Sequence, residues 1–396
     1  MTTTERALTV SETAFLLAGF GPVVVRTTFA GSFEPKVLEA AWQRLGLEYP
    51  LLRCGILGGL DGFRLSLRNE LPEVADGAAG FGDDITRRLA DGAISRLSLH
   101  ETSDATALTL AVDHAVSDGR LVRNLLHDLL RIYTALSRDE TLPAAPRPVF
   151  EPSLEELFEG QYEQGWPEPP SVLGDPLTLS GGPGKPPSGF GVHHLEFEPG
   201  PTAEIVAIAR KNGISITGLL CGAVSSAIRA RLPESDGSLP VTLRVPIDFR
   251  ERLVPPLDAL AQLCGALPCT VTVSVAADDE PLKVGLHATS ELRAVLERDE
   301  PQRALLAQRH SPAPPPPTTI VVSNIGEAGD PVLPDGLRVT GSRFATTLNG
   351  PVPGMFVSTT SGRLTLDVVF DRAFHNAEEI AEVMASVEAT LRAMTP

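Results

Sequence analysis

The sequence predicts a mixed α/β protein made of two lobes, each a two-layer α+β sandwich in which helices cover a sheet. Three observations carry this prediction. The chain has 396 residues, enough for two to three domains or two halves of one unit. Segments with the two-residue period of strands and the helical period of 3.6 residues occur in both halves. A stretch rich in proline and glycine, 141–190, separates the halves.

The first half contains one strand–turn–helix unit with clear periodicity, after a helical pattern over 33–46. Residues 106–114 alternate between apolar and other side chains and predict a strand that ends at His114. A turn follows, and apolar residues then recur at helical spacing over 120–137. Asp118, or the serine before it, suits the N-cap of this helix.

The second half alternates in the same way. We expect strands over 192–198, 241–249, 266–276 and 318–326, a strand pair over 354–371, and helices over 202–213, 215–232, 281–298 and 377–393. The predicted organisation is an N-terminal lobe over 1–150, an interlobe linker over 151–190 and a C-terminal lobe over 191–396.

Composition excludes several classes of function. Fifty acidic residues against 33 Lys and Arg leave a net charge of −17, which argues against nucleic acid or an anionic membrane as a partner. The four cysteines form no CxxC pair, and no metal site is expected. We expect a cytoplasmic protein, because neither a membrane span nor a signal peptide is visible. We also expect a monomer.

One histidine stands out on chemical grounds. The chain has no GxSxG, P-loop, GxGxxG or HExxH motif. His114 ends a strand, where a rigid scaffold can hold a catalytic side chain, and neutral imidazole accepts protons near pH 7. The residues alone leave an alternative open, in which His114 is a structural histidine and Asp118 only a helix cap.

The run His114–Gly119 reads HxxxDG between a strand and a helix, and four other segments follow the same family pattern. These are Glu48–Arg53, Val245–Leu253, Ser323–Gly326 and Leu364–His375. Together they resemble the superfamily of chloramphenicol acetyltransferase, peptide-synthetase condensation domains and PapA-type (polyketide-associated) acyltransferases. The family usually has HHxxxDG, whereas this chain has Asp113 first; strand alternation points that side chain away from the His114 face.

The resemblance implies two chloramphenicol-acetyltransferase-like lobes that form a V with a tunnel between them. It implies an acyltransferase, in bacterial secondary-metabolite or lipid biosynthesis, that moves an acyl group from a thioester to a hydroxyl or amine of a small molecule. Acyl-CoA or a phosphopantetheinyl thioester would be the co-substrate, with no permanently bound cofactor. Two alternatives are a free-standing condensation enzyme that forms an amide and a catalytically silent binding protein on the same fold.

The resemblance also implies roles for single residues. His114 is the general base. Asp118 and Gly119 form the structural turn, with Arg53 as the arginine that pairs with Asp118. Asp248 and Arg250 stabilise a lobe away from the chemistry, unless Arg250 is simply solvated at the surface.

Further residues serve the substrates in this interpretation. The candidates for the oxyanion site or the acyl tunnel are Asn324, Ser323 and Ser358. An acyl or peptidyl carrier protein would dock on local cations such as Arg120, Arg123 and Arg131. His127 shares the polar side of the same predicted helix, where we expect a solvated face.

Overall fold

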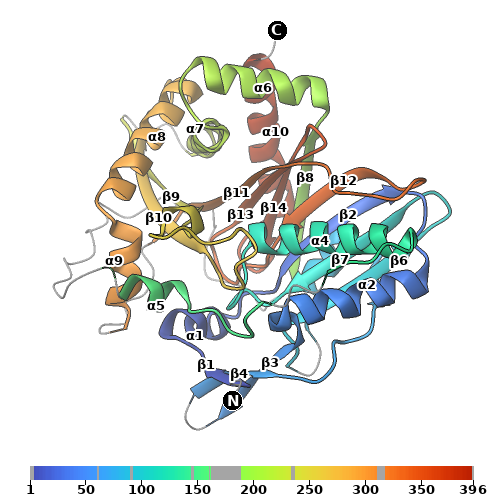
Figure 1. Ribbon diagram of the computed structural model, residues 1–396. Helices are drawn as coiled ribbons and strands as arrows, with labels where there is room; N and C mark the ends of the chain where they lie inside the picture. The colour runs from blue at the N-terminus through green and yellow to red at the C-terminus, as the bar shows by residue number, and fades with distance from the viewer. Residues whose placement is uncertain are drawn as a thin grey trace. The chain divides into compact units, whose positions relative to one another are not determined.

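The structure is a computed structural model of the chain (Figure 1). It describes residues 4–59, 62–89, 92–143, 147–159, 161, 189–232, 237–309 and 317–394. Most of the predicted linker, 151–190, therefore lies outside the described residues.

The chain divides into two compact units, and both are discontinuous in sequence. Unit 1 comprises Met1–Glu163, Asp248–Gly265 and Ala328–Thr346, and unit 2 comprises Gln164–Ile247, Ala266–Glu327 and Thr347–Pro396. The predicted lobes ran without interruption along the chain. In the structure, the segments 248–265 and 328–346 come from the second half of the sequence, but they pack in unit 1 with residues of the first half.

Unit 1 is built on a five-stranded sheet in the order β12-β2-β7-β6-β5. Its strands are β2 (Val23–Ala30), β5 (Ala75–Asp76), β6 (Ser95–Glu101), β7 (Thr106–Val112) and β12 (Arg338–Ala345). The central strands β2, β7 and β6 pair antiparallel, and β12 adds antiparallel to β2. Every residue of β7 is buried, so the strand that leads to His114 lies in the interior of its sheet.

Helices α2 (Pro35–Glu48) and α4 (Gly119–Ser137) pack on each other beside this sheet (Figure 1). Unit 1 also contains α1 (Val10–Leu17), α3 (Phe81–Thr86), α5 (Leu154–Glu159), the 3₁₀ turns η1 (Pro50–Arg53) and η2 (Arg250–Arg252), and a small sheet of β1 (Glu5–Ala7), β4 (Gly62–Leu67) and β3 (Cys54–Gly59). The helix predicted over 120–137 is confirmed as α4. Its apolar side chains recur at helical spacing and are buried.

Unit 2 has a six-stranded sheet in the order β10-β9-β11-β13-β14-β8. Its strands are β8 (Phe190–Phe197), β9 (Leu239–Asp248), β10 (Ala266–Val275), β11 (Ile320–Ala328), β13 (Gly354–Thr360) and β14 (Arg363–Asp371). The helices are α6 (Pro199–Lys211), α7 (Ile216–Ala230), α8 (Pro281–Glu297), α9 (Glu300–Ala307) and α10 (Ala377–Met394). Apolar side chains of the sheet, α6, α7, α8 and α10 form one core. The predicted mixed α/β class is confirmed.

In the described part of the chain, no single helix has the length and hydropathy of a membrane span. The pair α6 and α7 reaches them together, but it is bent by 97° at its break.

Close packing of α7 on α8 depends on a glycine. A Cβ placed on Gly222 would lie 2.1 Å from the carbonyl oxygen of Pro281 and 2.8 Å from the Cα of Gly285. Since the obstacles are backbone atoms, a side chain at this position could be accommodated only if the helices moved apart.

We therefore expect Gly222→Ala to lower the free energy of unfolding by about 1–3 kcal/mol, the usual effect of overpacking. Thermal and urea unfolding measure it. Gly200→Ala in α6 is the matched control, because a Cβ there meets nothing within 4 Å. Equal unfolding curves for the two variants would contradict the packing argument.

Candidate active site

The HxxxDG motif occupies the turn that joins β7 to α4 in unit 1. β7 ends at Val112, and α4 begins at Gly119, which is buried. The hydroxyl of Ser117 donates to the backbone oxygens of Val112 and Asp113, at 3.2 and 2.8 Å. These bonds close the turn and fix the backbone conformation around His114.

The imidazole of His114 is held in one tautomer. Its Nδ1 lies 3.0 Å from the carbonyl oxygen of Ser117. A carbonyl oxygen can only accept a hydrogen bond, so Nδ1 carries the proton of the neutral ring and Nε2 keeps its lone pair. The ring of Phe15 stacks on the imidazole, with 4.6 Å between ring centroids.

Burial lowers the pKa of His114, because the charged ring would lose its hydration. The bond to Ser117 and the carboxylates of Asp118 and Asp113 act in the opposite direction without reversing the shift. The ring is therefore neutral at pH 7. A neutral imidazole with a lone pair on Nε2 has the chemistry of a general base.

Asp113 stands where the family usually has its first histidine. Its Oδ1 accepts a hydrogen bond from the backbone N–H of Ala115 at 2.9 Å. Burial raises the pKa of this carboxyl, and the Ala115 bond and the neighbouring His114 oppose that rise. The side chain thus stabilises the start of the turn.

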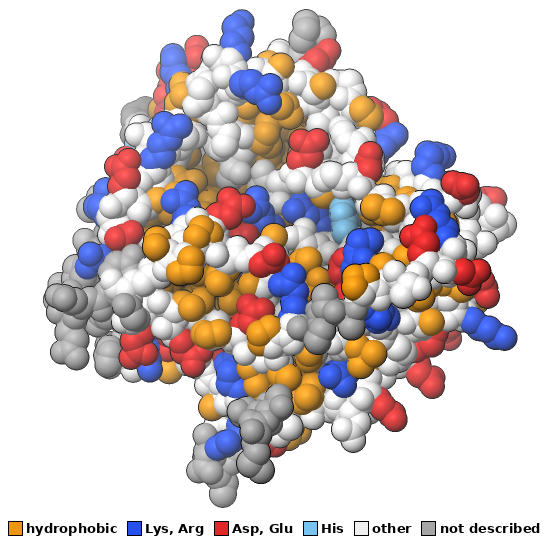
Figure 2. All heavy atoms as spheres, viewed as in Figure 1, with side chains coloured by type: hydrophobic (Ala, Val, Ile, Leu, Met, Phe, Trp, Pro, Cys, Tyr) orange, Lys and Arg blue, Asp and Glu red, His pale blue; other side chains and the backbone are white. Residues whose placement is uncertain are grey.

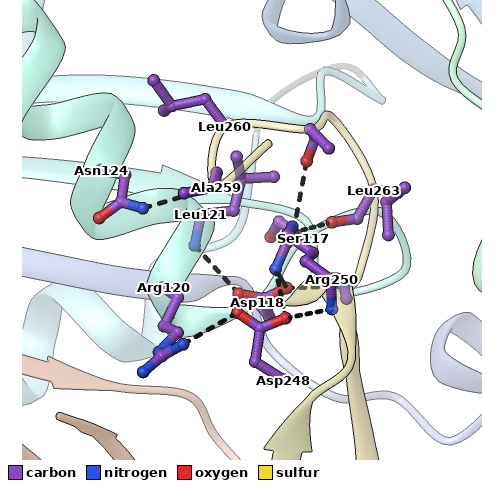
Figure 3. Close-up of polar contacts among 12 residues, drawn as sticks. Ser117, Asp118, Arg120, Leu121, Asn124, Asp248, Arg250, Ala259, Leu260 and Leu263 are labelled. Carbon is purple, nitrogen blue, oxygen red and sulfur yellow. Dashed lines mark hydrogen bonds and ion pairs between the residues drawn. The ribbon is translucent and has the colours of Figure 1, made fainter. Parts of the chain in front are cut away.

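Asp118 is buried and connects three parts of unit 1. Its Oδ1 accepts from the N–H of Leu121 at 3.0 Å, which makes it the N-cap of α4 as predicted. Its Oδ2 accepts from the N–H of Gly265 at 2.7 Å and lies 2.8 Å from Nη1 of Arg250 (Figure 3). Burial alone would raise the pKa of Asp118, but the charge of Arg250 and the two N–H groups lower it.

Arg250 is fixed from several sides by hydrogen-bond acceptors. Its side chain is 1% exposed, and Nη1 also lies 3.3 Å from Oδ1 of Asp248. Its Nη2 donates to the carbonyl oxygens of Ala261 and Leu263, at 3.3 and 2.5 Å. A Cβ on Gly265 would lie 2.3 Å from Nη1, so glycine is needed where the guanidinium passes the backbone.

The predicted pairing of Asp118 with Arg53 is corrected by this geometry. Arg53 ends η1, and its Nε is buried without a hydrogen-bond partner among the described residues. Arg250 takes the place next to Asp118. The alternative that Arg250 is solvated at the surface is wrong, because segment 248–265 buries it against the motif.

The candidate oxyanion residues all belong to unit 2. Asn324 on β11 donates through Nδ2 to Oγ1 of Thr217 at 3.2 Å, and its Oδ1 accepts from the N–H of Gly326 at 2.8 Å. The hydroxyl of Ser358 on β13 is buried and lies 2.9 Å from that of Thr365. Ser323 on β11 is half-buried. Because its amide donates to Thr217 in the first turn of α7, Asn324 already has a structural role.

The three arginines proposed for carrier docking differ in their surroundings. The side chains of Arg120 and Arg131 are 40% and 41% exposed. Arg123 is only 8% exposed. His127 is also half-buried rather than solvated, and burial, followed by the charge of Arg123, lowers its pKa to about 4. Among the described residues, no three His, Cys, Asp or Glu side chains form a group suited to a metal ion.

Known proteins resemble this chain in sequence and in fold. A family model described as the C-terminus of phthiocerol/phthiodiolone dimycocerosyl transferase matches residues 186–369. Azaphilone biosynthesis cluster protein M of Aspergillus terreus is 24% identical, over 93% of this chain and 87% of that protein. O-acetyltransferase pigM of Monascus ruber is 20% identical, over 66% of this chain and 57% of that protein.

Solved structures share the fold over nearly the whole chain. Polyketide synthase associated protein 5 from Mycobacterium tuberculosis superposes with a TM-score of 0.76 and 18% identity, covering 98% of this chain and 97% of that one. The trichothecene 15-O-acetyltransferase TRI3 from Fusarium sporotrichioides gives a TM-score of 0.73 and 12% identity, with 99% and 95% covered. The predicted resemblance and the prediction of an acyltransferase are confirmed.

The Asp118–Arg250 pair makes a stability prediction. Removing either charge leaves the other buried and uncompensated, so Asp118→Asn and Arg250→Ala should each cost about 3–5 kcal/mol of unfolding free energy. Urea unfolding at pH 7 measures this loss. Arg53→Ala is the matched control and should unfold much closer to the wild type.

The same pair predicts a pH dependence. The folded pKa of Asp118 lies below its ordinary value, so its stabilisation is complete above about pH 5 and is lost as the pH falls below about 4. The difference in stability between wild type and Asp118→Asn should shrink in that acid range. A difference that stays constant down to about pH 2 would contradict the assignment.

Proposed function

We propose that this acyltransferase moves an acyl group from a thioester to a hydroxyl group of a small molecule in secondary-metabolite biosynthesis, with His114 as the general base. The donor thioester is acyl-CoA or an acyl group on a phosphopantetheinyl carrier protein. The observation that carries the proposal is the 3.0 Å contact between Nδ1 of His114 and the carbonyl oxygen of Ser117. Because that oxygen can only accept, the contact leaves Nε2 as the proton acceptor.

The relatives support a hydroxyl acceptor and a biosynthetic setting. One relative is named an O-acetyltransferase and another a protein of an azaphilone biosynthesis cluster. The structural neighbour TRI3 is named a 15-O-acetyltransferase. Amide formation by a free-standing condensation enzyme remains the alternative outcome of the acceptor test.

The chemical steps follow from a neutral base. Nε2 of His114 takes the proton of the acceptor hydroxyl while the oxygen attacks the thioester carbonyl and forms a C–O bond. The tetrahedral intermediate then collapses, and the C–S bond breaks. The departing sulfur receives the proton from the imidazolium of His114, which returns to its neutral form. The products are an ester and a free thiol.

Ser117 and Asp118 act as positioning residues in this scheme. The Ser117 carbonyl selects the tautomer of His114 and stabilises the imidazolium through the Nδ1–H bond. Asp118 fixes the backbone that presents this carbonyl, through its bonds to Leu121 and Gly265. The catalytic residue in the described part of unit 1 is His114.

Acyl transfer is tested by intact mass spectrometry of hydroxyl and amine acceptors after incubation with a set of acyl thioesters. His114→Ala should lower turnover by about 10²–10⁴, the usual contribution of acid–base catalysis, with the fold retained. His100→Gln, a half-buried histidine of β6, is the matched control and should keep wild-type turnover. Full activity in a folded His114→Ala variant would reject the role. A wild-type chain that binds thioesters without product would indicate the silent binding protein.

The pH profile gives a second test of the base. Since burial lowers the pKa of His114, the ring stays neutral below its ordinary value of about 6.5. We expect kcat/KM to remain on its plateau at pH 6.5 and to fall only at lower pH. Steady-state rates in overlapping buffers from about pH 4.5 to 9 measure this limb. An acid limb with an apparent pKa of about 7 or higher would contradict the assignment.

A further inference from the structure

A cavity of about 240 Å³ lies in unit 1 beside the first two turns of α4. One wall is formed by this helix and the other by segment 248–265. The lining residues are Arg120, Arg123, Asn124, Asp248, Arg250, Glu251, Leu257 and Ala259. The amide of Asn124 donates to the carbonyl oxygen of Ala259 at 3.3 Å, which ties the two walls together (Figure 3).

Three guanidinium groups line this cavity, and they have different roles. Arg250 is held by Asp118 and Asp248, which neutralise it. Arg120 is 40% exposed, and its Nη1 lies 3.3 Å from the second oxygen of Asp248. Arg123 is 8% exposed and lies one helical turn further along α4. In Figure 2, basic, acidic and hydrophobic side chains are interspersed on the face of the molecule where α4 lies in Figure 1.

The cavity is unfavourable for the positive charge of Arg123. Burial and then the like charge of Arg120 lower the pKa of Arg123 to about 10, although Asp118 and Asp248 act in the opposite direction. Glu251 is exposed, so water screens its charge. The positive end of the α4 dipole adds to the potential. An anion in the cavity would relieve this electrostatic cost.

We infer that Arg120 and Arg123 form a phosphate-binding site that holds the phosphate of the thioester donor. Guanidinium groups bind phosphate through paired N–H donors, and a helix N-terminus favours the same ligand. The inference rests on the proposed function, because every donor in that proposal carries a phosphate next to its pantetheine arm. The site also lies at the end of α4 that follows His114, so one unit holds the base and the anion site.

Isothermal titration calorimetry of the full chain with coenzyme A, 4′-phosphopantetheine and pantetheine tests the site. Wild type should bind both phosphorylated probes more tightly than pantetheine. Arg123→Gln and Arg120→Gln should each weaken that binding by about 10- to 100-fold, the usual effect of losing a hydrogen bond to a charged group. Their affinity for pantetheine should stay unchanged.

Arg138→Gln is the matched control, because it removes the same charge from the exposed C-terminal end of α4. Arg120→Gln keeps the test decisive if Arg123→Gln fails to fold, since Arg120 is partly exposed. Wild-type affinity for the phosphorylated probes in a folded Arg120→Gln variant, or an equal loss in Arg138→Gln, would overturn the site.

The probes also distinguish the source of the phosphate. Equal affinity for coenzyme A and 4′-phosphopantetheine would support binding of the phosphate that coenzyme A and carrier proteins share. Much tighter binding of coenzyme A would support a free nucleotide donor. The binding measurement needs no turnover. A failure of the phosphate site can therefore be distinguished from a failure of the proposed acyl transfer. A chain that transfers acyl groups while both variants bind normally would reject only the site.

Discussion

The buried ion pair between Asp118 and Arg250 is the constraint on which the site depends. Two charges taken from water are costly unless each is well hydrogen-bonded. Here the carboxylate accepts from two backbone N–H groups, and the guanidinium also reaches the carbonyl oxygens of Ala261 and Leu263. The compensation comes from backbone atoms in defined places, so the pair is stable only when β7, α4 and segment 248–265 are all correctly positioned.

That local fold determines what His114 can do. The turn is closed on one side by the hydroxyl of Ser117 and on the other by the N-cap of Asp118. Between these two fixed points, the carbonyl of Ser117 faces Nδ1 of the imidazole. A base whose tautomer is set before the substrate binds does not have to reorganise during the reaction. Asp118 acts on this ring indirectly, because it fixes the backbone that orients it.

The sequence allowed the strand–turn–helix unit to be predicted because each part has a local signal. The alternation up to His114, the cap at Asp118 and the helical spacing after it all depend on residues close together in the chain. The partner of Asp118 has no such signal. Arg53 fitted the family pattern, whereas Arg250 reaches the motif because segment 248–265 packs into unit 1. Arg123, which helical periodicity alone places on a polar face, is only 8% exposed and lines a cavity together with residues of this segment.

His114 remains neutral beside two carboxylates because burial outweighs their charges. Asp118 and Asp113 both favour the protonated ring, whereas burial favours the neutral one, and burial is the larger effect. Arg250 lies 2.8 Å from Asp118 and carries the opposite charge. Burial raises the pKa of Asp113, which makes its charge easier to lose. The arginine that stabilises the turn therefore also offsets one of the two negative charges near His114.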